Sequence, residues 1–236
     1  MSDLSGRTAL VTGASRGIGR QVAESLSRAG ARVWGLARSE DDLADLSRHH
    51  GVEPLRVDLR DETATWLALD DMTDVMGGAP DIVVNAAGTF GIAACDKESV
   101  ASFDAQIAVN LRGPFLVVRA LLPAMLERRS GLIVNIGSVA GRRAFTGNAA
   151  YSASKFGLRG FHEVLLEELK GSGVRASLVE PAATDTPLWD PLEPDSDPNL
   201  PDRADMLAAS EVADAVLFIA TRSDTVSIPV LRVERG

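Results

Sequence analysis

Short apolar runs alternate along the chain with longer segments in which apolar residues recur every three or four positions. The short runs predict buried strands at residues 8–12, 31–36, 54–57, 81–84, 132–138, 174–179 and 226–233. The longer segments predict helices from the first glycine-rich turn to residue 29, and then over 40–48, 62–76, 102–110, 114–129, 151–171 and 212–220. Strands that alternate with helices are typical of a doubly wound α/β sheet with helices on both faces, in one domain over residues 1–236.

The sequence pattern does not decide the structure of two stretches. The segment 102–129 predicts either one long helix or two, because Arg112-Gly113-Pro114 interrupts its apolar pattern. The segment Pro187–Pro201 has five prolines and four acidic residues and little regular pattern. It predicts either a lid over a site or a disordered loop, as part of a substrate-loop insert at 187–208 that includes a short helix at 204–207.

Composition and charge narrow the class of protein. A net charge of −9 at pH 7 leaves no electrostatic footprint for nucleic acid. No single apolar run approaches the length of a membrane span, and a polar N-terminus leads directly into a strand, so neither a membrane partner nor a signal peptide is expected. The lone Cys95 fits a reducing, cytoplasmic setting. His49, His50 and His162 lack metal-ligand spacing, so no metal site is expected.

A glycine-rich turn follows the first predicted strand and opens the first predicted helix. The spacing of Gly13, Gly17 and Gly19 is G-x-x-x-G-x-G. Glycines let the backbone approach a pyrophosphate closely, and the helix N-terminus supplies free N–H groups and a favourable dipole. The strand, turn and helix together predict a dinucleotide site.

The second predicted strand indicates which dinucleotide binds. An acidic residue near its end would hydrogen-bond the adenosine ribose of NAD, but the chain has Ala37 there, followed by Arg38. Arg16 lies inside the glycine-rich turn. Two cations without a carboxylate suit the 2′-phosphate of NADP, with NAD the less favoured cofactor. The alternative is that Arg38 only begins a surface turn.

The only tyrosine of the chain, Tyr151, stands four residues before Lys155. On a helix these side chains share one face, and a nearby ammonium group favours the phenolate. Ser138 follows a buried strand, at the carboxyl end where open α/β sheets hold their ligands. A serine that holds a carbonyl oxygen, a tyrosine that gives it a proton and a lysine that tunes the tyrosine predict a carbonyl-reducing site. The alternative is a tyrosine packed in the core and a solvated lysine.

Three further places carry candidate polar or small residues. Asp58 ends a predicted strand, where its carboxylate would accept from an adenine amine. The segment Asn85–Gly88 ends another strand, and its small residues would admit a flat ring. Asn110 is a polar residue in an apolar run and needs hydrogen-bond partners if it is buried.

The order and spacing of these motifs, over nearly the whole length, resemble the short-chain dehydrogenase/reductase family, in its short, single-domain branch. The resemblance implies a Rossmann-like, seven-stranded parallel sheet and hydride transfer with a nicotinamide cofactor. It also implies that Tyr151 is the general acid/base, Ser138 holds the carbonyl oxygen and Lys155 contacts the nicotinamide ribose and lowers the tyrosine pKa. Asn110 would hold a water in a proton relay.

The resemblance also implies a cofactor-binding set and a homotetramer, with a dimer as the alternative. The cofactor-binding set is Gly13, Ser15, Arg16, Gly17, Ile18, Gly19, Arg38, Asp58, Leu59, Asn85, Ala86, Ala87, Gly88, Tyr151, Lys155, Pro181, Thr184 and Thr186.

Three positions depart from the family pattern. Ala182 follows Pro181 where glycine is usual, and Thr184 stands where an aliphatic residue is common. The C-terminus, Leu231–Gly236, lacks the usual glycine-rich ending.

The predicted substrate end is apolar, so we expect a small, largely hydrophobic carbonyl or alcohol substrate. The candidate substrate residues are Phe90, Val139, Phe145, Leu188 and Trp189. Arg142 and Arg143 would instead suit a carboxylate or phosphate, and Arg128 and Arg129 an acidic acyl carrier. The latter would make the protein a 3-oxoacyl-(acyl carrier protein) reductase.

Two other functions remain open from the sequence. A non-catalytic NADP-binding regulator would normally have lost part of the serine–tyrosine–lysine set, which is complete here. A nucleotide-sugar epimerase or dehydratase would need a longer C-terminal substrate domain.

Overall fold

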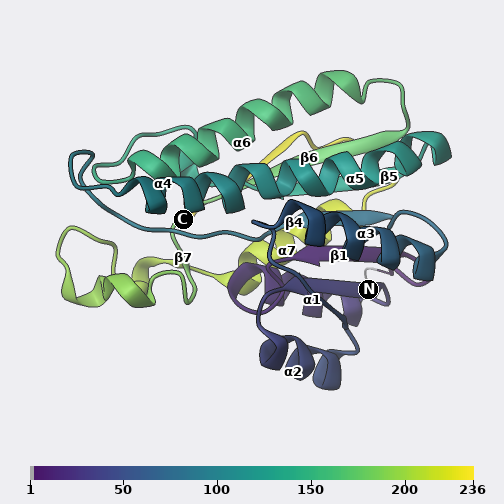
Figure 1. Ribbon diagram of the computed structural model, residues 1–236, viewed down its shortest axis with the longest axis horizontal. Helices are drawn as coiled ribbons and strands as arrows, with labels where there is room; N and C mark the ends of the chain where they lie inside the picture. The colour runs from purple at the N-terminus through teal and green to yellow at the C-terminus, as the bar shows by residue number, and fades with distance from the viewer. Residues whose placement is uncertain (1–2) are drawn as a thin grey trace.

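The structure, a computed structural model, describes residues 3–236. Its centre is a seven-stranded, wholly parallel sheet in the order β3-β2-β1-β4-β5-β6-β9 (Figure 1). The strands are β1 (Thr8–Thr12), β2 (Arg32–Ala37), β3 (Glu53–Arg56), β4 (Ile82–Asn85), β5 (Gly131–Ile136), β6 (Val174–Pro181) and β9 (Val230–Val233). The predicted doubly wound fold is therefore confirmed, with strand bounds that differ from the prediction by a few residues.

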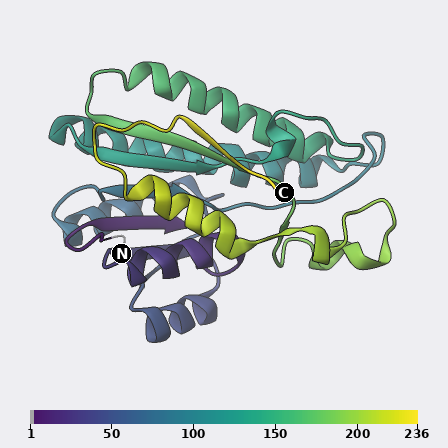
Figure 2. The same ribbon diagram turned by 180° about the vertical axis from the view of Figure 1, so that it is seen from behind.

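Helices cover both faces of the sheet, and each face has its own apolar core (Figures 1 and 2). Helices α1 (Gly17–Arg28), α2 (Glu40–His50) and α7 (Ala209–Ala220) pack on one face. Helices α3 (Glu62–Met76), α5 (Gly113–Arg128) and α6 (Ala149–Glu168) pack on the other. Neighbouring residues of β1 serve opposite faces, because side chains alternate along a strand: Val11 joins the first core and Leu10 the second.

Local signals in the sequence explain where several helices begin and end. The side chain of Asp61 accepts a hydrogen bond from the backbone N–H of Ala64 at 3.0 Å and so caps the start of α3. Gly77 ends that helix in the left-handed conformation, with φ of 77°. Ser39 and Gly51 do the same for α2. The predicted bounds of α3 are confirmed at both ends.

The segment predicted as one helix or two is a single continuous helix. It begins with α4 (Val100–Ile107), widens into a π-helical turn at Ala108–Arg112 and continues as α5. Proline lacks an N–H, so Pro114 cannot donate to the carbonyl of Asn110 as an α-helix requires. The wider turn lets the helix pass this point without a break.

This continuous helix, Val100–Arg128, is long and apolar enough to cross a membrane by length and composition. The sequence prediction did not identify it as such, because the pattern is interrupted at Gly113 and Pro114. Core helices of soluble domains pass the same test, and α5 packs on the sheet through Val117, Leu121 and Met125.

The segment that follows β6 is more regular than the sequence predicted. Strand β7 (Thr184–Asp185) pairs with β8 (Leu207–Ala208), and between them lie 3-10 turns at Asp190–Leu192, Pro194–Ser196 and Arg203–Asp205. The helix predicted at 204–207 is therefore a 3-10 turn followed by β8. The last strand begins four residues later than predicted, because Pro229 has no N–H for the ladder.

Candidate active site

Two adjoining hollows open at the carboxyl ends of the strands. The first, of about 180 Å³, is lined by the glycine-rich turn and the ends of β2, β3 and β4. The second, of about 760 Å³, is lined by the ends of β5 and β6, the start of α6 and the segment after β7. The two form one cleft, because five residues line both hollows: Ile18, Ala86, Gly88, Thr186 and Leu188.

Two positions of the glycine-rich turn lie too close to neighbouring backbone atoms to carry any side chain. A Cβ at Gly13 would lie 2.6 Å from the Cα of Ala87, and one at Gly19 would lie 2.3 Å from the carbonyl oxygen of Gly13. Helix α1 begins at Gly17, so its first N–H groups face the hollow. A turn without side chains at a helix N-terminus fits a dinucleotide pyrophosphate.

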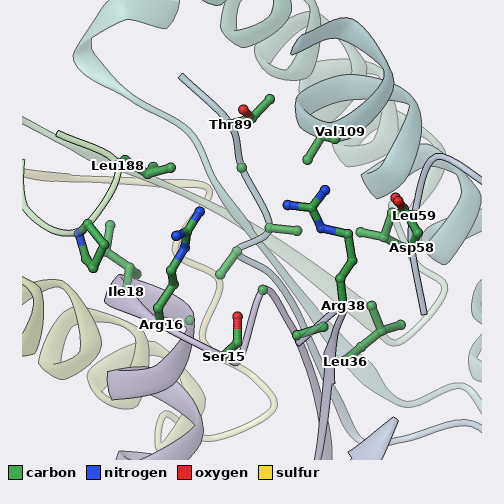
Figure 3. A pocket seen from close by; sticks show the side chains of 18 of the residues that line it. Ser15, Arg16, Ile18, Leu36, Arg38, Asp58, Leu59, Thr89, Val109 and Leu188 are labelled. Atoms are coloured by element: carbon green, nitrogen blue, oxygen red, sulfur yellow. The ribbon is translucent and has the colours of Figure 1, made fainter. Parts of the chain in front are cut away.

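Arg16 and Arg38 both line the first hollow (Figure 3). Neither side chain makes a hydrogen bond or ion pair with any residue of the described range 3–236. Ala37, beside Arg38, lines the same hollow without contributing a carboxylate. Two arginines without acidic partners fit a phosphate group.

Asp58 lies at the rim of the first hollow but is paired with a neighbour. Its carboxylate accepts from the backbone N–H of Arg60 at 3.0 Å and from the guanidinium of the same residue at 2.6 Å. Hydrogen bonds from Arg60, together with the charges of Arg60 and Arg38, lower the pKa of Asp58. Leu59, the next residue, also lines the hollow.

Some residues at the end of β4 and just after it line the first hollow, and one instead ties two strands together. Ala86, Ala87 and Gly88 line the first hollow, and the N–H groups of Ala86 and Ala87 donate to the hydroxyl of Thr12 at 3.1 Å. Asn85 does not line either hollow. Its side chain is buried and donates to Asn135 at 2.9 Å, which ties β4 to β5.

Ser138, Tyr151 and Lys155 converge on the second hollow. Ser138 follows β5 and accepts from the backbone N–H of Ala140 at 3.1 Å. Tyr151 and Lys155 lie one turn apart on α6, as their spacing predicted. The ammonium of Lys155 donates to the carbonyl of Ile136 at 2.9 Å and lies 5.7 Å from the centre of the Tyr151 ring.

Burial sets the ionisation of this group. Desolvation raises the pKa of Tyr151, and a hydrogen bond with Ser138 offsets part of that rise. Desolvation also lowers the pKa of Lys155, to about 8. The sequence predicted that Lys155 lowers the tyrosine pKa, but in this structure its ammonium is directed to the Ile136 carbonyl and the phenol responds to burial.

Asn110 is fully buried in the π-helical turn and lines neither hollow. Its side-chain oxygen accepts from the N–H of Thr89 at 2.8 Å, and its amide donates to the Thr89 carbonyl at 2.9 Å and to Ser154 at 3.0 Å. The side chain therefore fixes the segment after β4, which lines the cleft, to α6. The main-chain carbonyl of Asn110 is the group that lacks its usual helical donor.

All five predicted substrate residues line the second hollow. Phe90 packs edge-on against Tyr151, with ring centres 4.7 Å apart, and against Trp189 at 5.0 Å. The indole N–H of Trp189 donates to the carbonyl of Thr184 at 3.1 Å. Because Trp189 lies in the segment after β7, this aromatic row joins that segment to the tyrosine.

Sequence reasoning identified Ser138, Tyr151 and Lys155 but missed four other polar residues of the second hollow, which are Thr146, Asn148, Asp197 and Asn199. The segment of Asp197 and Asn199 was identified from its prolines, but nothing in its pattern tells which side chains face inward. In the first hollow the missed residues are Leu36, Val57, Arg60, Thr89, Ala105, Val109 and Pro187.

The arginines considered for anionic substrates have other partners. Arg142 pairs with Glu234 and lies 3.6 Å from Glu180, and it lines neither hollow. Arg143 is exposed and stacks over Phe145 at 5.2 Å.

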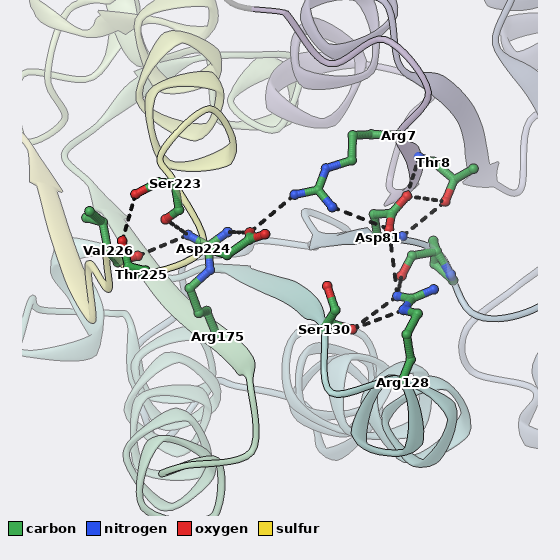
Figure 4. Close-up of polar contacts among 11 residues, drawn as sticks. Arg7, Thr8, Asp81, Arg128, Ser130, Arg175, Ser223, Asp224, Thr225 and Val226 are labelled. Atoms are coloured by element: carbon green, nitrogen blue, oxygen red, sulfur yellow. Dashed lines mark hydrogen bonds and ion pairs between the residues drawn. The ribbon is translucent and has the colours of Figure 1, made fainter.

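Arg128 and Arg129 lie at the opposite end of the sheet. Arg128 donates to the carbonyls of Ala79 and Pro80 at 2.8 and 3.1 Å, within a network that also contains Asp81 (Figure 4). Arg129 donates to the carbonyl of Gly171 at 2.8 Å. The start of β5 stands about 23 Å from Ser138 along an extended strand, so within one protomer these arginines do not adjoin the site.

The fold and the cleft define a nucleotide-dependent oxidoreductase of the doubly wound α/β class. Residues 7–197 match the family described as short chain dehydrogenase. The chain is 34% identical over 227 residues to the 3-oxoacyl-[acyl-carrier-protein] reductase FabG of Salmonella typhimurium, covering 92% of this chain and 90% of that one. The chain belongs to the short-chain dehydrogenase family, whose members bind a nicotinamide cofactor and act on a CH–OH/C=O pair.

Two further relatives show the breadth of the similarity. The D-threitol dehydrogenase of Mycolicibacterium smegmatis is 34% identical over 230 residues, with 92% of this chain and 87% of that one covered. The structure of a metagenomic short-chain oxidoreductase in complex with NADP has a TM-score of 0.84 and 34% identity, and covers 99% of this chain and 98% of that one.

Proposed function

We propose that the protein is an NADP(H)-dependent oxidoreductase that transfers a hydride between the nicotinamide and a small, largely apolar carbonyl or alcohol. One observation carries the proposal: Ser138, Tyr151 and Lys155 converge on an apolar hollow that is continuous with a glycine-lined one. When bound, the cofactor supplies or accepts the hydride. The residues of the chain bind, orient and protonate.

Each catalytic residue has a distinct role in this proposal. The Ser138 hydroxyl holds the carbonyl oxygen, and the Tyr151 phenol gives it a proton or takes one from the alcohol. Lys155 holds the nicotinamide ribose and returns protons to the tyrosine. The main-chain carbonyl of Asn110 holds a water that continues the relay, while its side chain holds Thr89 and Ser154.

The preference for NADP rests on Arg16 and Arg38. Both line the first hollow, and Ala37 stands where an acidic residue would receive the ribose hydroxyls of NAD. The NADP-bound relative at 34% identity supports the same assignment. Apart from Asn85, whose buried side chain contacts Asn135, the remaining cofactor residues of the sequence prediction would contact the rest of the dinucleotide, with Pro181, Thr184 and Thr186 at the nicotinamide.

An apolar substrate is favoured by the aromatic and aliphatic lining of the second hollow. We propose that residues 187–208 form the substrate loop. A second candidate, reduction of a 3-oxoacyl group on an acyl carrier, is favoured by the similarity to a reductase of that name. The place of Arg128 and Arg129 at the opposite end of the sheet opposes an acidic carrier within one protomer, and the complete serine–tyrosine–lysine set opposes a non-catalytic NADP-binding regulator.

We also propose a cytoplasmic homotetramer, with a dimer as the alternative. Exposed phenylalanines lie on α4, α5 and α6 at Phe103, Phe115 and Phe156, and a second exposed apolar group lies on α7 and β9 at Phe218 and Val230. Two separate apolar faces support two interfaces, as a tetramer of two-fold symmetry needs. The acidic net charge supports a small-molecule substrate as the partner, rather than nucleic acid or a membrane, and the single cysteine supports the cytoplasmic setting.

The proposal is tested by NADPH oxidation across aldehydes, ketones and 3-oxoacyl thioesters, free and carrier-bound. Tyr151→Phe should lose at least about 100-fold in kcat, because the phenol is the proton donor, and should keep its affinity for NADPH. Lys155→Ala should weaken both. Turnover by Tyr151→Phe near the unmodified rate would refute the catalytic assignment.

A further inference from the structure

The C-terminal tail lies against the catalytic end of the sheet. Strand β9 pairs with β6, with Val233 opposite Pro181, and the N–H of Ala182 donates to the carbonyl of Val233 at 2.9 Å. In both views the C-terminus lies at the same end of the molecule as the segment after β7 (Figures 1 and 2). The residues after Val233 therefore lie beside Pro181 and Ala182, which line the second hollow and form one wall of it. We call the second hollow the substrate hollow below.

This wall is stabilised by the buried carboxylate of Glu180, the residue before Pro181. Glu180 of β6 is 1% exposed and lies 3.5–3.6 Å from Arg142, Arg159 and Arg232. These arginines come from the loop after Ser138, from α6 and from β9. A buried carboxylate needs cationic neighbours, so Glu180 holds all three elements together.

The tail adds a second partner to one of these arginines. The carboxylate of Glu234 accepts a hydrogen bond from Arg142. The loop that contains Arg142 also contributes Val139, Ala140 and Phe145 to the hollow. Glu234 thus holds the loop that forms one side of the substrate hollow.

The next residue, Arg235, contacts residues 204 and 205 of the substrate loop, on the other side of the hollow. Arg235 donates to the carbonyl of Ala204 and pairs with Asp205 at 3.1 Å. The adjacent Arg203 pairs with Asp190 at 2.6 Å, and its backbone N–H donates to Asp195 at 2.7 Å. The restraint at Asp205 is therefore passed to the turns that contribute Trp189 and Asp197 to the hollow.

We propose that Glu234 and Arg235 form a clamp across the substrate hollow, one residue holding the loop after Ser138 and the other holding the substrate loop. They are positioning residues, since neither lines the hollow. The inference rests on the proposed function in that it takes this hollow as the substrate site. It gives a physical role to a C-terminus that departs from the family pattern.

The clamp predicts a specific pattern of kinetic change. Arg235→Asp should raise KM for the carbonyl substrate by up to about fivefold, as expected for an exposed ion pair, and leave the affinity for NADPH unchanged. Glu234→Gln should raise the same KM through the other wall. Matched controls are Lys170→Asp and Glu167→Gln, which alter an exposed ion pair at the C-terminal end of α6, far from the hollow.

A charge-reversal rescue tests the contact itself. Asp205→Arg alone should raise KM as Arg235→Asp does. The double variant Arg235→Asp/Asp205→Arg should bring KM back toward the unmodified value, short of full recovery, because an aspartate at position 235 cannot donate to the Ala204 carbonyl. Limited proteolysis of the substrate loop without cofactor or substrate gives a readout besides activity. Cleavage within 188–202 should quicken up to about fivefold in each single variant and slow again, toward the unmodified rate, in the double variant.

The outcomes separate the clamp from the proposed function. If no substrate turns over but the proteolysis pattern holds, the clamp stands and the proposed function fails. Single variants that match Lys170→Asp in cleavage rate, or a double variant without rescue, would overturn the clamp.

Discussion

Arg16 and Arg38 have few direct contacts and a large expected influence on function. Both are cations on the lining of the first hollow, and no acidic side chain in the described part of the chain pairs with either. A 2′-phosphate would place a doubly charged anion between them. At the residue scale, we therefore expect cofactor choice to depend on charge rather than on shape.

Reversing one of these charges should change the cofactor. We expect Arg38→Asp to lower kcat/KM for NADPH by at least about tenfold, since it removes a charged hydrogen bond to phosphate and adds repulsion. Efficiency with NADH should be retained or improved, because the new carboxylate suits ribose hydroxyls. Steady-state kinetics with both cofactors measures this, and equal efficiency of the unmodified protein with both would contradict it.

The lowered pKa of Lys155 makes stability depend on pH in a defined window. Between pH 8 and 10 an unfolded lysine is still largely protonated while folded Lys155 has lost much of its charge, so the unfolded state binds more protons. The free energy of unfolding of the cofactor-free protein should therefore rise with pH, by about 2 kcal/mol from this residue.

Urea unfolding of the protein and of Lys155→Met at pH 8, 9 and 10 measures the effect. The rise should be absent from the variant, whose side chain does not titrate. The window ends at pH 10, because the raised pKa of Tyr151 makes stability fall above that point. Parallel pH curves for both proteins would show that Lys155 is not desolvated.

The segment 187–208 is the element with the most unusual construction. Its five prolines gave no helical or strand pattern, yet it folds into short turns joined by Arg203 and closed by the β7–β8 pair. It contacts the rest of the domain through Trp189, through the buried Leu207 of β8 and through the tail. Its short turns and exposed ion pairs are features of segments of low local stability.

Opening of this element should be visible to a protease. We expect the first cleavage of the free protein within Leu188–Asp202, and protection when NADPH and a substrate are both present, because closure orders the loop. Mass spectrometry of the first fragments identifies the cut. A first cut elsewhere, or no protection on binding, would mean that the segment does not close over the site.

The whole molecule presents two apolar faces that one protomer does not cover. One lies on α4, α5 and α6, where Phe115 packs edge-on against Phe161 with ring centres 6.0 Å apart, and the other on α7 and β9. Single exposed apolar residues are ordinary, but groups of phenylalanines on neighbouring helices mark contact surfaces.

Light scattering at micromolar concentration should therefore give the mass of a tetramer. Phe115→Asp and Phe218→Asp, one on each face, should each reduce it to a dimer, because a buried charge disrupts one interface and leaves the other. A monomer mass for the unmodified protein would refute the assembly. A dimer that only one substitution disrupts would support the alternative.

Short-range patterns in the sequence determined the order of strands and helices, the glycine-rich turn and the placement of Tyr151 and Lys155 on one helix face. These features depend on residues a few positions apart, and apolar periodicity, caps and glycine spacing report such neighbours directly. The tyrosine, lysine and serine converge as predicted, because parallel strands bring their carboxyl ends to one edge.

The tertiary structure decided what depends on residues far apart in the chain. It turned Asn85 toward Asn135 instead of the cleft, engaged Arg142 with Glu180 and Glu234, and directed Lys155 to a backbone carbonyl. It also carried the helix through Pro114 by a π-helical turn. The partner of such a side chain is determined by how distant segments pack across the sheet. Local periodicity does not indicate which distant charge or carbonyl will lie within hydrogen-bond distance.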